Sequence, residues 1–530
     1  MKAEPRIVAA PTDRARLCAA AAILFALAAL VFDAGRLFAA GEAALRFRWE
    51  LDYGEGIVWE QMRLMLAGRG YGPIDGLPAI VFHYPPVFHL VTAALAGGTG
   101  LDPLAAGRLV SLSSTLLTGA FAGLVAAKAV RAETSLPVAA LCGVVGGLAV
   151  FSFWPVAYWA PLMRVDMLAT ALSLAGVYAA MLALKRPPLI LLASVCFVAA
   201  VYTKQTSIVA PGAVFLTFLL LRPRLAWACA GGCILLGLAA LGALAWSTDG
   251  GFVRHIFLYN VNRFEAWRLL LIQDVVLAHL FYFVVLAIGL AARLKSRLPL
   301  YRRAGSVAAL RERLSSAPGD AFLLLVLVYA VLAGLMTLSV AKSGSNVNYF
   351  IEWVAVLAIL LGILVQDAAA AAVAGIRAGG STRLIAQPAL LPLLIGVQAL
   401  VVPPLPGRTE TLAGARIPQL EALSTMVRNA GRPVISDDMV LLRRSGVPIQ
   451  WEPAIFAELA STGAWDERRF VQYIRARRFA FFVTVGDRGQ RLFDSRYNPA
   501  VAEAIDAAYP VRRKLAGYTL HIPAKTESVR

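Results

Sequence analysis

The chain of 530 residues is 59% apolar and 15% charged, whereas soluble domains average about 45–50% apolar and about 25% charged residues. This composition excludes an ordinary soluble protein and indicates a membrane protein that spends most of its length on spans. The net charge of +18 would suit nucleic acid, but its distribution argues against that partner. The densest basic segment, 293–313, holds seven basic residues and one acid between two apolar runs, which is typical of a cytoplasmic loop beside lipid headgroups.

The first apolar run, from about 17 to 38, follows the basic residues Lys2, Arg6, Arg14 and Arg16. A cleavable signal peptide has a shorter apolar core, and this run is long enough to span a bilayer. We therefore predict that it stays as the first transmembrane helix, with the N-terminus in the cytoplasm.

Further apolar runs bring the total to about eleven spans, in a mainly α, polytopic fold. They lie near 105–128, 136–156, 167–184, 188–203, 206–221, 225–246, 269–292, 319–341, 349–366 and 384–405. One more run, 84–98, is short, begins with Pro85-Pro86 and ends in two glycines. We predict that it re-enters the membrane or lies at its surface, because counting it as a crossing would put the later basic loops on the wrong side.

The basic loops decide the orientation of these spans. With eleven crossings the basic loops all fall on one side, which we place in the cytoplasm of a bacterium. These loops are Lys128/Arg131, Lys185/Arg186, Arg222/Arg224, 293–313 and Arg377/Arg383. The protein is thus predicted to lie in the inner membrane. The polar segments then face the periplasm, namely 41–83, 157–166, 247–268, 342–348 and everything after 405.

Residues 406–530 have a different character from the transmembrane domain, 1–405, because charges and turns replace the long apolar runs. Helices and strands are predicted to alternate there, with helices near 417–430 and 466–477 and strands at 433–436, 447–451 and 479–485. This alternation predicts a small periplasmic α/β domain. Its sequence contains no phosphate-binding glycine loop, nucleophile elbow or paired zinc ligands.

The first periplasmic loop, 41–83, carries three carboxylates within six residues, Glu50, Asp52 and Glu55. A reaction in which a hydroxyl attacks needs a base for the hydroxyl proton, and a phosphate leaving group needs cationic or metal stabilisation. Asp52 can act as the base, and Glu55 can position the acceptor or share a metal ion. A solvated acidic loop is the alternative interpretation.

The segment that begins with His83-Tyr84-Pro85-Pro86 leads back to the membrane. Its prolines leave backbone carbonyls unsatisfied, which is tolerated only against protein or a water-filled cavity. His83 is therefore a candidate ligand for phosphate or a metal ion. A lone histidine is also commonly a structural hydrogen-bonding group.

Other polar residues of the same face are candidates for substrate binding. Arg164 and Asp166 lie at the boundary of a span, where charges mark either an anchor or a site. Lys204, followed by Gln205, is the single charge in more than thirty residues, which suits a lipid phosphate, with a snorkelling anchor as the alternative. Two further loops add cations, amides and an imidazole, which are Arg254, His255, Asn260, Lys342 and Asn346.

Together these motifs resemble the C-type glycosyltransferase (GT-C) superfamily. The resemblance rests on an acidic motif after the first helix, a Pro-Pro entry, an Arg-x-Asp segment that starts a later span, and a periplasmic C-terminal domain. The stretch from Asp52-Tyr53-Gly54-Glu55-Gly56 to Tyr84-Pro85-Pro86 looks like the Asp-Glu-Gly and Pro-Pro signatures of the aminoarabinose-transferase and protein O-mannosyltransferase branch. In this chain the two acids are three positions apart, whereas that branch often has them adjacent.

The resemblance implies an inverting transfer of a hexosyl or pentosyl group from a polyprenyl-phosphate donor to a lipid, glycan or protein acceptor. The family's catalytic carboxylate falls on Asp52 or Glu55, with Glu50, Tyr53, His83 and Tyr84 among the substrate-binding candidates. Some members of the family use a divalent cation and others do not. A divalent cation, Mg²⁺ or Mn²⁺, is the candidate, with Asp52, Glu55 and Asp166 as its ligands.

Two other classes of function fit parts of the sequence. A transporter or flippase for a lipid-linked sugar keeps its site near the bilayer midplane, often between internal repeats. Here the ionisable residues gather at one surface and the two halves show no repeat. A membrane-anchored sensor or scaffold explains the C-terminal domain but not eleven crossings.

Overall fold

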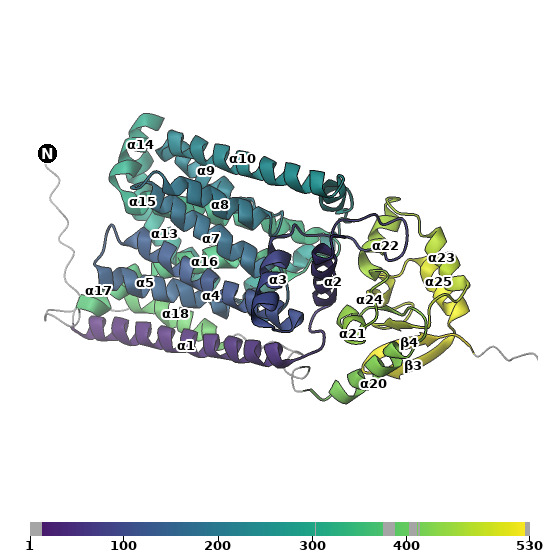
Figure 1. Ribbon diagram of the computed structural model, residues 1–530. Coiled ribbons are helices and arrows are strands. Elements are labelled where there is room, and N and C mark those ends of the chain that lie inside the picture. Colours follow the sequence, from purple (N-terminus) through teal and green to yellow (C-terminus); the bar gives the residue numbers. More distant parts are fainter. Residues whose placement is uncertain (1–12, 303, 375–386, 402–410, 412–413, 525–530) are drawn as a thin grey trace, which may run out of the picture.

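The computed structural model describes residues 13–302, 304–374, 387–401, 411 and 414–524. A bundle of long helices forms one part, and a smaller domain of helices and short strands lies against one end of it (Figure 1). The protein is therefore a mainly α, multi-pass membrane protein with a small C-terminal α/β domain, as predicted. The predicted domain boundary at 405 lies outside the described residues.

In the described part of the chain, six helices are long and apolar enough to cross a membrane. They are α1 (Asp13–Arg46), α4 (Pro103–Val130), α7 (Asp166–Ala183), α10 (Pro223–Ser247), α15 (Pro318–Met336) and α16 (Ile351–Leu364). One bent pair passes the same test together, namely η3–α12 (Ala266–Ala278) and α13 (Leu280–Arg302), with a bend of 77°.

Shorter apolar helices complete the bundle. They are α3 (Val87–Thr99), α5 (Leu136–Ala149), α8 (Leu189–Val201), α9 (Val209–Leu221) and α18 (Gln387–Val401). Every predicted span contains one of the long helices, the bent pair or one of these shorter helices, and the short run 84–98 is α3. Length and composition alone thus identify six or seven spans, and the shorter helices pack between them.

Prolines define where several of these helices begin. α4, α10 and α15 each start with Pro103, Pro223 or Pro318 in the first turn, where the missing N–H costs no helical hydrogen bond. At α4 the Asp102 carboxylate also caps the helix by accepting a hydrogen bond from Ala105 N at 3.3 Å. These starts turn the chain sharply and keep the connections short.

Small residues let the central helices approach one another closely. A Cβ atom on Gly123 of α4 would lie 2.7 Å from the carbonyl oxygen of Gly143 in α5. A Cβ atom on Gly362 of α16 would lie 2.5 Å from the carbonyl oxygen of Cys142. Any side chain at these positions would push the backbones apart, so glycine is required for this packing.

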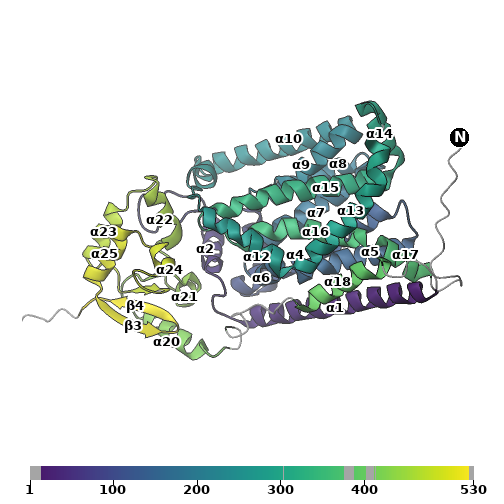
Figure 2. The same cartoon turned by 180° about the vertical axis from the view of Figure 1, so that it is seen from behind.

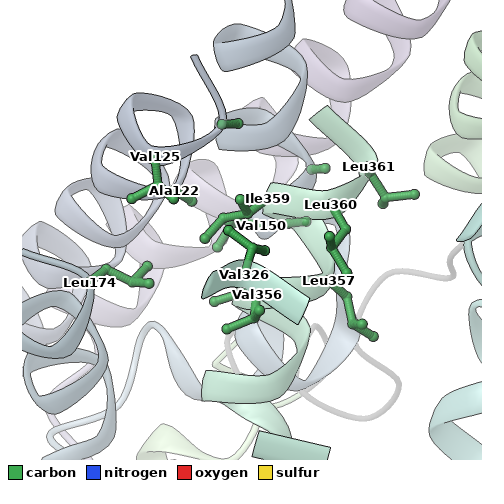
Figure 3. Close-up of a cluster of buried hydrophobic side chains, with 14 of the residues drawn as sticks. Ala122, Val125, Val150, Leu174, Val326, Val356, Leu357, Ile359, Leu360 and Leu361 are labelled. Carbon is green, nitrogen blue, oxygen red and sulfur yellow. The ribbon is translucent and has the colours of Figure 1, made fainter. Parts of the chain in front are cut away.

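The apolar core fills the space around this contact. Apolar side chains of α4, η1 (Val150–Ser152), α7, α15 and α16 pack together there (Figure 3). Among them are Val125, Val150, Leu174, Val326 and Ile359. α10 lies at the other extreme, because only 6% of its most apolar window is buried in the protein. It therefore lies at the edge of the bundle, where it packs against α8 and α9.

The two ends of the bundle differ in charge. The described basic loops gather at the end that carries α14 (Val307–Ser316) and α17 (Gln366–Ala374), opposite the C-terminal domain (Figures 1 and 2). There Arg297 pairs with Glu133 at 2.7 Å. The predicted basic loop with Arg377 and Arg383 lies outside the described residues. The described basic loops thus lie at one end of the bundle, as the predicted topology requires.

The C-terminal domain is built on a four-stranded sheet with the order β1-β2-β4-β3. β1 (Ile435–Ser436) pairs in parallel with β2 (Phe482–Thr484), and β4 (Tyr518–Ile522) runs antiparallel to both β2 and β3 (Val511–Leu515). The helices of this domain are α20 (Ile417–Arg428), α21 (Met439–Arg444), α22 (Pro453–Ser461), α23 (Arg468–Arg475), α24 (Arg491–Asp494) and α25 (Pro499–Ala508).

The predictions for this domain are confirmed in part. The helices near 417–430 and 466–477 and the strands at 433–436 and 479–485 correspond to α20, α23, β1 and β2. The strand expected at 447–451 is wrong, because Trp451 makes one isolated bridge to Ala79 and does not join the sheet. Its apolar residues pack against the loop of the transmembrane part, and this packing produces a sequence pattern like that of a strand.

Candidate functional site

Asp52 and Arg164 meet at the end of the bundle that faces the C-terminal domain. Asp52 directly precedes Tyr53 and α2 (Gly54–Leu66), and its Oδ1 accepts a hydrogen bond from Gly54 N at 3.1 Å. Arg164 Nη1 lies 3.4 Å from the same oxygen, and the two side chains are 14% and 15% exposed. Asp52 Oδ2 accepts no hydrogen bond from any residue that the structure describes. The carboxylate thus keeps one oxygen available beside a guanidinium group.

A glycine makes room for this guanidinium group. A Cβ atom on Gly54 would lie 1.2 Å from Arg164 Nη1. The first residue of α2 therefore cannot carry a side chain while Arg164 keeps its place. Arg164 Nη2 also lies 3.3 Å from the Tyr84 hydroxyl, so the Pro-Pro entry segment contributes to the same cluster.

Glu55 is held in a closed ion pair with Arg108, separate from the contact between Asp52 and Arg164. Arg108 donates to both of its oxygens at 2.8 and 2.7 Å, and both side chains are fully buried. Met163 N and Leu51 N donate to the same carboxylate at 3.0 and 2.8 Å. Burial opposes ionisation, but Arg108 and these amides lower the pKa of Glu55 below its usual range. The geometry therefore favours a positioning role for Glu55 and leaves Asp52 as the candidate base.

The sequence analysis did not identify Arg108, although this residue is central to the arrangement. Its remaining donors bind the carbonyl oxygens of Ala44, Phe47 and Trp49, at 2.7, 2.5 and 2.8 Å. It thereby ties the end of α1 to the loop that carries Asp52. An arginine within the first turns of an otherwise apolar helix was the signal that could have identified it.

A second polar cluster surrounds Asp166 at the start of α7. Lys204 Nζ lies 2.7 Å from Asp166 Oδ1, which also accepts from Asn348 Nδ2 at 2.8 Å. The Lys204 ammonium lies 4.7 Å from the centre of the Tyr349 ring. These side chains and Glu352 line a small pocket of about 20 Å³. Lys204 is thus buried in an ion pair at this pocket, whereas a snorkelling anchor would extend to the headgroups.

Trp159 joins the two clusters. Its Nε1 donates to Asp166 Oδ2 at 2.6 Å, while the Arg164 guanidinium lies 5.4 Å from its ring. The contact between Asp52 and Arg164 and the pocket at Lys204 are therefore parts of one continuous polar region.

Several predicted site residues lie at the edge of this region or serve the fold. Gln205 Nε2 donates to the His83 carbonyl at 2.9 Å, and burial, with Arg164 and His255 nearby, lowers the pKa of the His83 ring to about 3. His255 bridges Phe82 N, at 3.0 Å, and Gly72 O, at 2.8 Å. His255 thus holds two loop segments together.

The remaining loop residues do not reach either cluster. Arg254 is exposed and donates to Asp249 O at 3.1 Å. Lys342 and Asn346 are exposed, and Asn346 caps its own turn through Val347 N at 2.8 Å. Asn260 makes no hydrogen bond to the described residues. From these loops the structure instead brings Asn348 and Tyr349 to the pocket.

The C-terminal domain contributes residues that the sequence analysis did not identify. Asp438 is buried and Glu50 is half-buried, and burial and the surrounding acids raise both pKa values. Glu50 Oε2 accepts from Met439 N at 3.2 Å. Glu50 therefore binds the C-terminal domain. Asp438 follows strand β1, and an acid at the carboxyl end of a buried strand was the signal available.

Tyr53 is bound by the same domain. Ala454 N donates to its hydroxyl at 3.1 Å, and the Arg496 guanidinium lies 4.1 Å from its ring. Glu452, two residues before Ala454, is 4% exposed. Burial raises its pKa to about 8, while Arg164 opposes that shift.

The residues predicted to bind a metal ion lie in separate ion pairs. Glu55 pairs with Arg108, Asp166 with Lys204, and Asp52 faces Arg164. In the described ranges no group of three or more histidine, cysteine or acidic side chains is placed to hold a metal ion. This set of donors, each facing a cation, does not fit a shared metal ion, and we assign no reaction step to one.

Comparison with known proteins extends the fold assignment. No family model matches the chain, and no curated protein is similar to it in sequence. The crystal structure of ArnT from Cupriavidus metallidurans bound to undecaprenyl phosphate matches with 14% identity and a TM-score of 0.53, covering 94% of this chain and 97% of that one. The apo structure of ArnT from the same organism matches with 14% identity and a TM-score of 0.46, covering 92% and 97%.

The first of these matches shows the fold. The chain shares nearly its whole length with ArnT, an aminoarabinose transferase with the GT-C fold. The GT-C resemblance that the motifs indicated is thus confirmed at the level of the fold.

Proposed function

We propose that the protein is a glycosyltransferase that moves a hexosyl or pentosyl group from a polyprenyl-phosphate donor to an acceptor hydroxyl. The observation that carries this proposal is the available oxygen of Asp52 beside Arg164, at the mouth of a polar region that continues to Lys204. The fold shared with a protein solved with undecaprenyl phosphate supports the choice of donor.

In the proposed reaction Asp52 takes the proton of the acceptor hydroxyl. The acceptor oxygen then forms a bond to C1 of the sugar, on the face opposite the phosphate. The bond from C1 to the phosphate oxygen breaks, and its electron pair stays on the polyprenyl phosphate. Attack from the opposite face inverts the configuration at C1.

The two cations suit the charge that develops in this step. Arg164 lies beside the base, and its partners raise its pKa further, so the group stays charged. Lys204 lies in the adjoining pocket with Asp166. Cations that are fixed beside a leaving phosphate in a protein site stabilise the transition state more than the same cations would in bulk water. Lys204 is therefore proposed to bind the phosphate group, and Arg164 to orient the acceptor side of the site beside Asp52.

We place the reaction on the periplasmic face of the bacterial inner membrane, with a lipid, glycan or protein as the acceptor. The distribution of basic loops supports this orientation. A transporter is less well supported, because Asp52 lies just before α2 and Asp166 begins α7, so both clusters lie at helix ends and not midway along a span.

Mass spectrometry of the cell envelope tests the proposal. A strain that lacks the gene should accumulate the unmodified acceptor, and the wild-type gene should restore the sugar. Asp52→Asn should not restore it, whereas Asp75→Asn, an exposed acid of the same loop, should. An envelope that is identical with and without the gene, or full restoration by Asp52→Asn, would contradict the proposal.

A further inference from the structure

Glu452 is a buried carboxyl group whose hydrogen bonds are incomplete. It immediately precedes α22 but makes no capping bond to that helix. Its Oε2 is buried and has no hydrogen-bond partner among the described residues. Buried polar groups are nearly always hydrogen-bonded, so an oxygen in this state indicates a position that accommodates a ligand.

Glu452 occupies the N-cap position of α22, but a residue of the transmembrane part accepts the hydrogen bond from the first turn of that helix. The free N–H of Ala454 in the first turn of α22 donates to the Tyr53 hydroxyl at 3.1 Å. Glu452 is therefore not needed as a helix cap. Tyr53 is adjacent to Asp52, so the start of α22 lies against the loop that carries the candidate base.

Arg164 approaches the same loop from the transmembrane part, beside Asp52. Its guanidinium group is also incompletely bonded, because its contacts to Asp52 and Tyr84 are long, at 3.4 and 3.3 Å. Its buried Nε donates to no residue in the part of the chain that the structure describes. Glu452 and Arg164 thus bring an unused acceptor and an unused donor into the same polar region as Asp52.

The C-terminal domain is fixed firmly enough to hold this arrangement. Ala79 N donates to Gln450 O at 2.8 Å, two residues before Glu452. On the other side of the domain, Arg444 binds Asp102 through two hydrogen bonds of 2.6 and 2.8 Å. Bonds at both sides of the contact restrict sliding of the domain and define where Glu452 lies.

We propose that Glu452 and Arg164 form a subsite for a hydroxyl group of the acceptor, so that the C-terminal domain supplies one wall of the site around Asp52. This inference rests on the proposed glycosyl transfer. A neutral carboxyl group both donates and accepts hydrogen bonds, and it suits an uncharged hydroxyl better than an anionic group. Glu452 is in this view a residue that positions the acceptor, and it takes no part in binding the lipid phosphate.

The test compares transfer with donor binding in the full-length protein. Glu452→Met keeps the volume and removes both oxygens, whereas Glu452→Gln keeps a donor and an acceptor. Glu458→Gln, in the same helix, is the matched control, because Glu458 pairs with the half-exposed Arg263 away from this subsite. Transfer is measured by mass spectrometry, with washed envelopes of the deletion strain as the acceptor and a lipid extract of that strain as the donor. Donor-side binding is measured with undecaprenyl phosphate alone.

Glu452→Met should lower transfer at least 10-fold at limiting envelope concentration, with partial recovery at high concentration. Its affinity for undecaprenyl phosphate should remain within 2-fold of the wild type. Glu452→Gln should keep transfer within about 3-fold, and Glu458→Gln should behave as the wild type. Normal transfer by Glu452→Met would overturn the inference, and so would an equal loss of transfer and undecaprenyl phosphate binding. If the wild type itself transfers nothing, the proposed function fails instead.

Discussion

The Arg108 guanidinium and the Glu55 carboxylate form two hydrogen bonds to each other in a place where neither side chain reaches solvent. Each group also binds the backbone around Asp52, through Leu51 N on one side and Trp49 O on the other. The pair therefore fixes the short segment that carries the candidate base. Four predictions follow from this arrangement and from the polar region beside it.

Removing one member of the pair should destabilise the protein strongly. Arg108→Met leaves Glu55 charged and buried without its partner, and such losses cost about 3–5 kcal/mol. We expect a markedly lower thermal midpoint for Arg108→Met and for Glu55→Met, measured on protein purified in detergent. The double variant should recover part of the loss, because it buries no lone charge. A normal midpoint together with lost transfer in Glu55→Met would instead assign Glu55 to the chemistry.

Most of the fold could be predicted from the sequence, because local features of the sequence determine it. Apolar runs of bilayer length and basic loops indicated the spans, and the structure has an apolar helix in each of them. The two terminal strands were missed because β3 is largely exposed and carries Arg512, Arg513 and Lys514, which do not alternate with apolar residues. Its partner β4 supplies the buried side of that hairpin.

The candidate site was harder to predict, since its residues come together from distant segments. Asp52, Arg164 and Lys204 were identified because charges are rare in an apolar chain. Whether a carboxylate is free or paired depends on its partner in space, and Arg108, 53 residues after Glu55, decided that question. Glu452 was missed because the soluble domain is rich in charged residues, so one acid there carries no signal.

Filling the space above Gly54 should disturb the site without unfolding the protein. In Gly54→Ala the new Cβ atom would overlap Arg164 Nη1, so the guanidinium must move away from Asp52. Alanine favours helix by about 1 kcal/mol relative to glycine, which supports α2. We expect transfer to fall at least 10-fold at an unchanged thermal midpoint. Gly76→Ala is the control, because its Cβ atom would meet no atom within 4 Å. Equal activity of the two variants would show that Arg164 need not lie over Gly54.

Lys204 should contribute to binding of the lipid phosphate. Replacing Lys204 by Met removes the ammonium group from the pocket, where little water competes for a phosphate. Because the change leaves Asp166 unpaired, Lys204→Met is combined with Asp166→Asn. We expect the double variant to bind undecaprenyl phosphate at least 10-fold more weakly than Asp166→Asn alone. Lys342→Met removes an exposed cation of the same face and should change nothing. Equal affinities of Asp166→Asn and the double variant would remove Lys204 from the phosphate site.

The pH dependence of stability should reveal the protonation of Glu452. Burial raises its pKa from 4.5 to about 8, so the folded protein holds a proton that the unfolded chain releases. The resulting stabilisation is complete below pH 4.5 and is lost as the pH rises through 8, by at most about 1.4 kcal/mol per pH unit for one proton. Of the groups that face it, Tyr53 has a pKa raised well above 10 and Arg164 has a raised pKa, so neither titrates in this window. The thermal midpoint of the wild type should therefore fall more steeply between pH 6 and 8 than that of Glu452→Gln, measured in the same detergent. Parallel curves for the two proteins would mean that Glu452 is already ionised in the folded state.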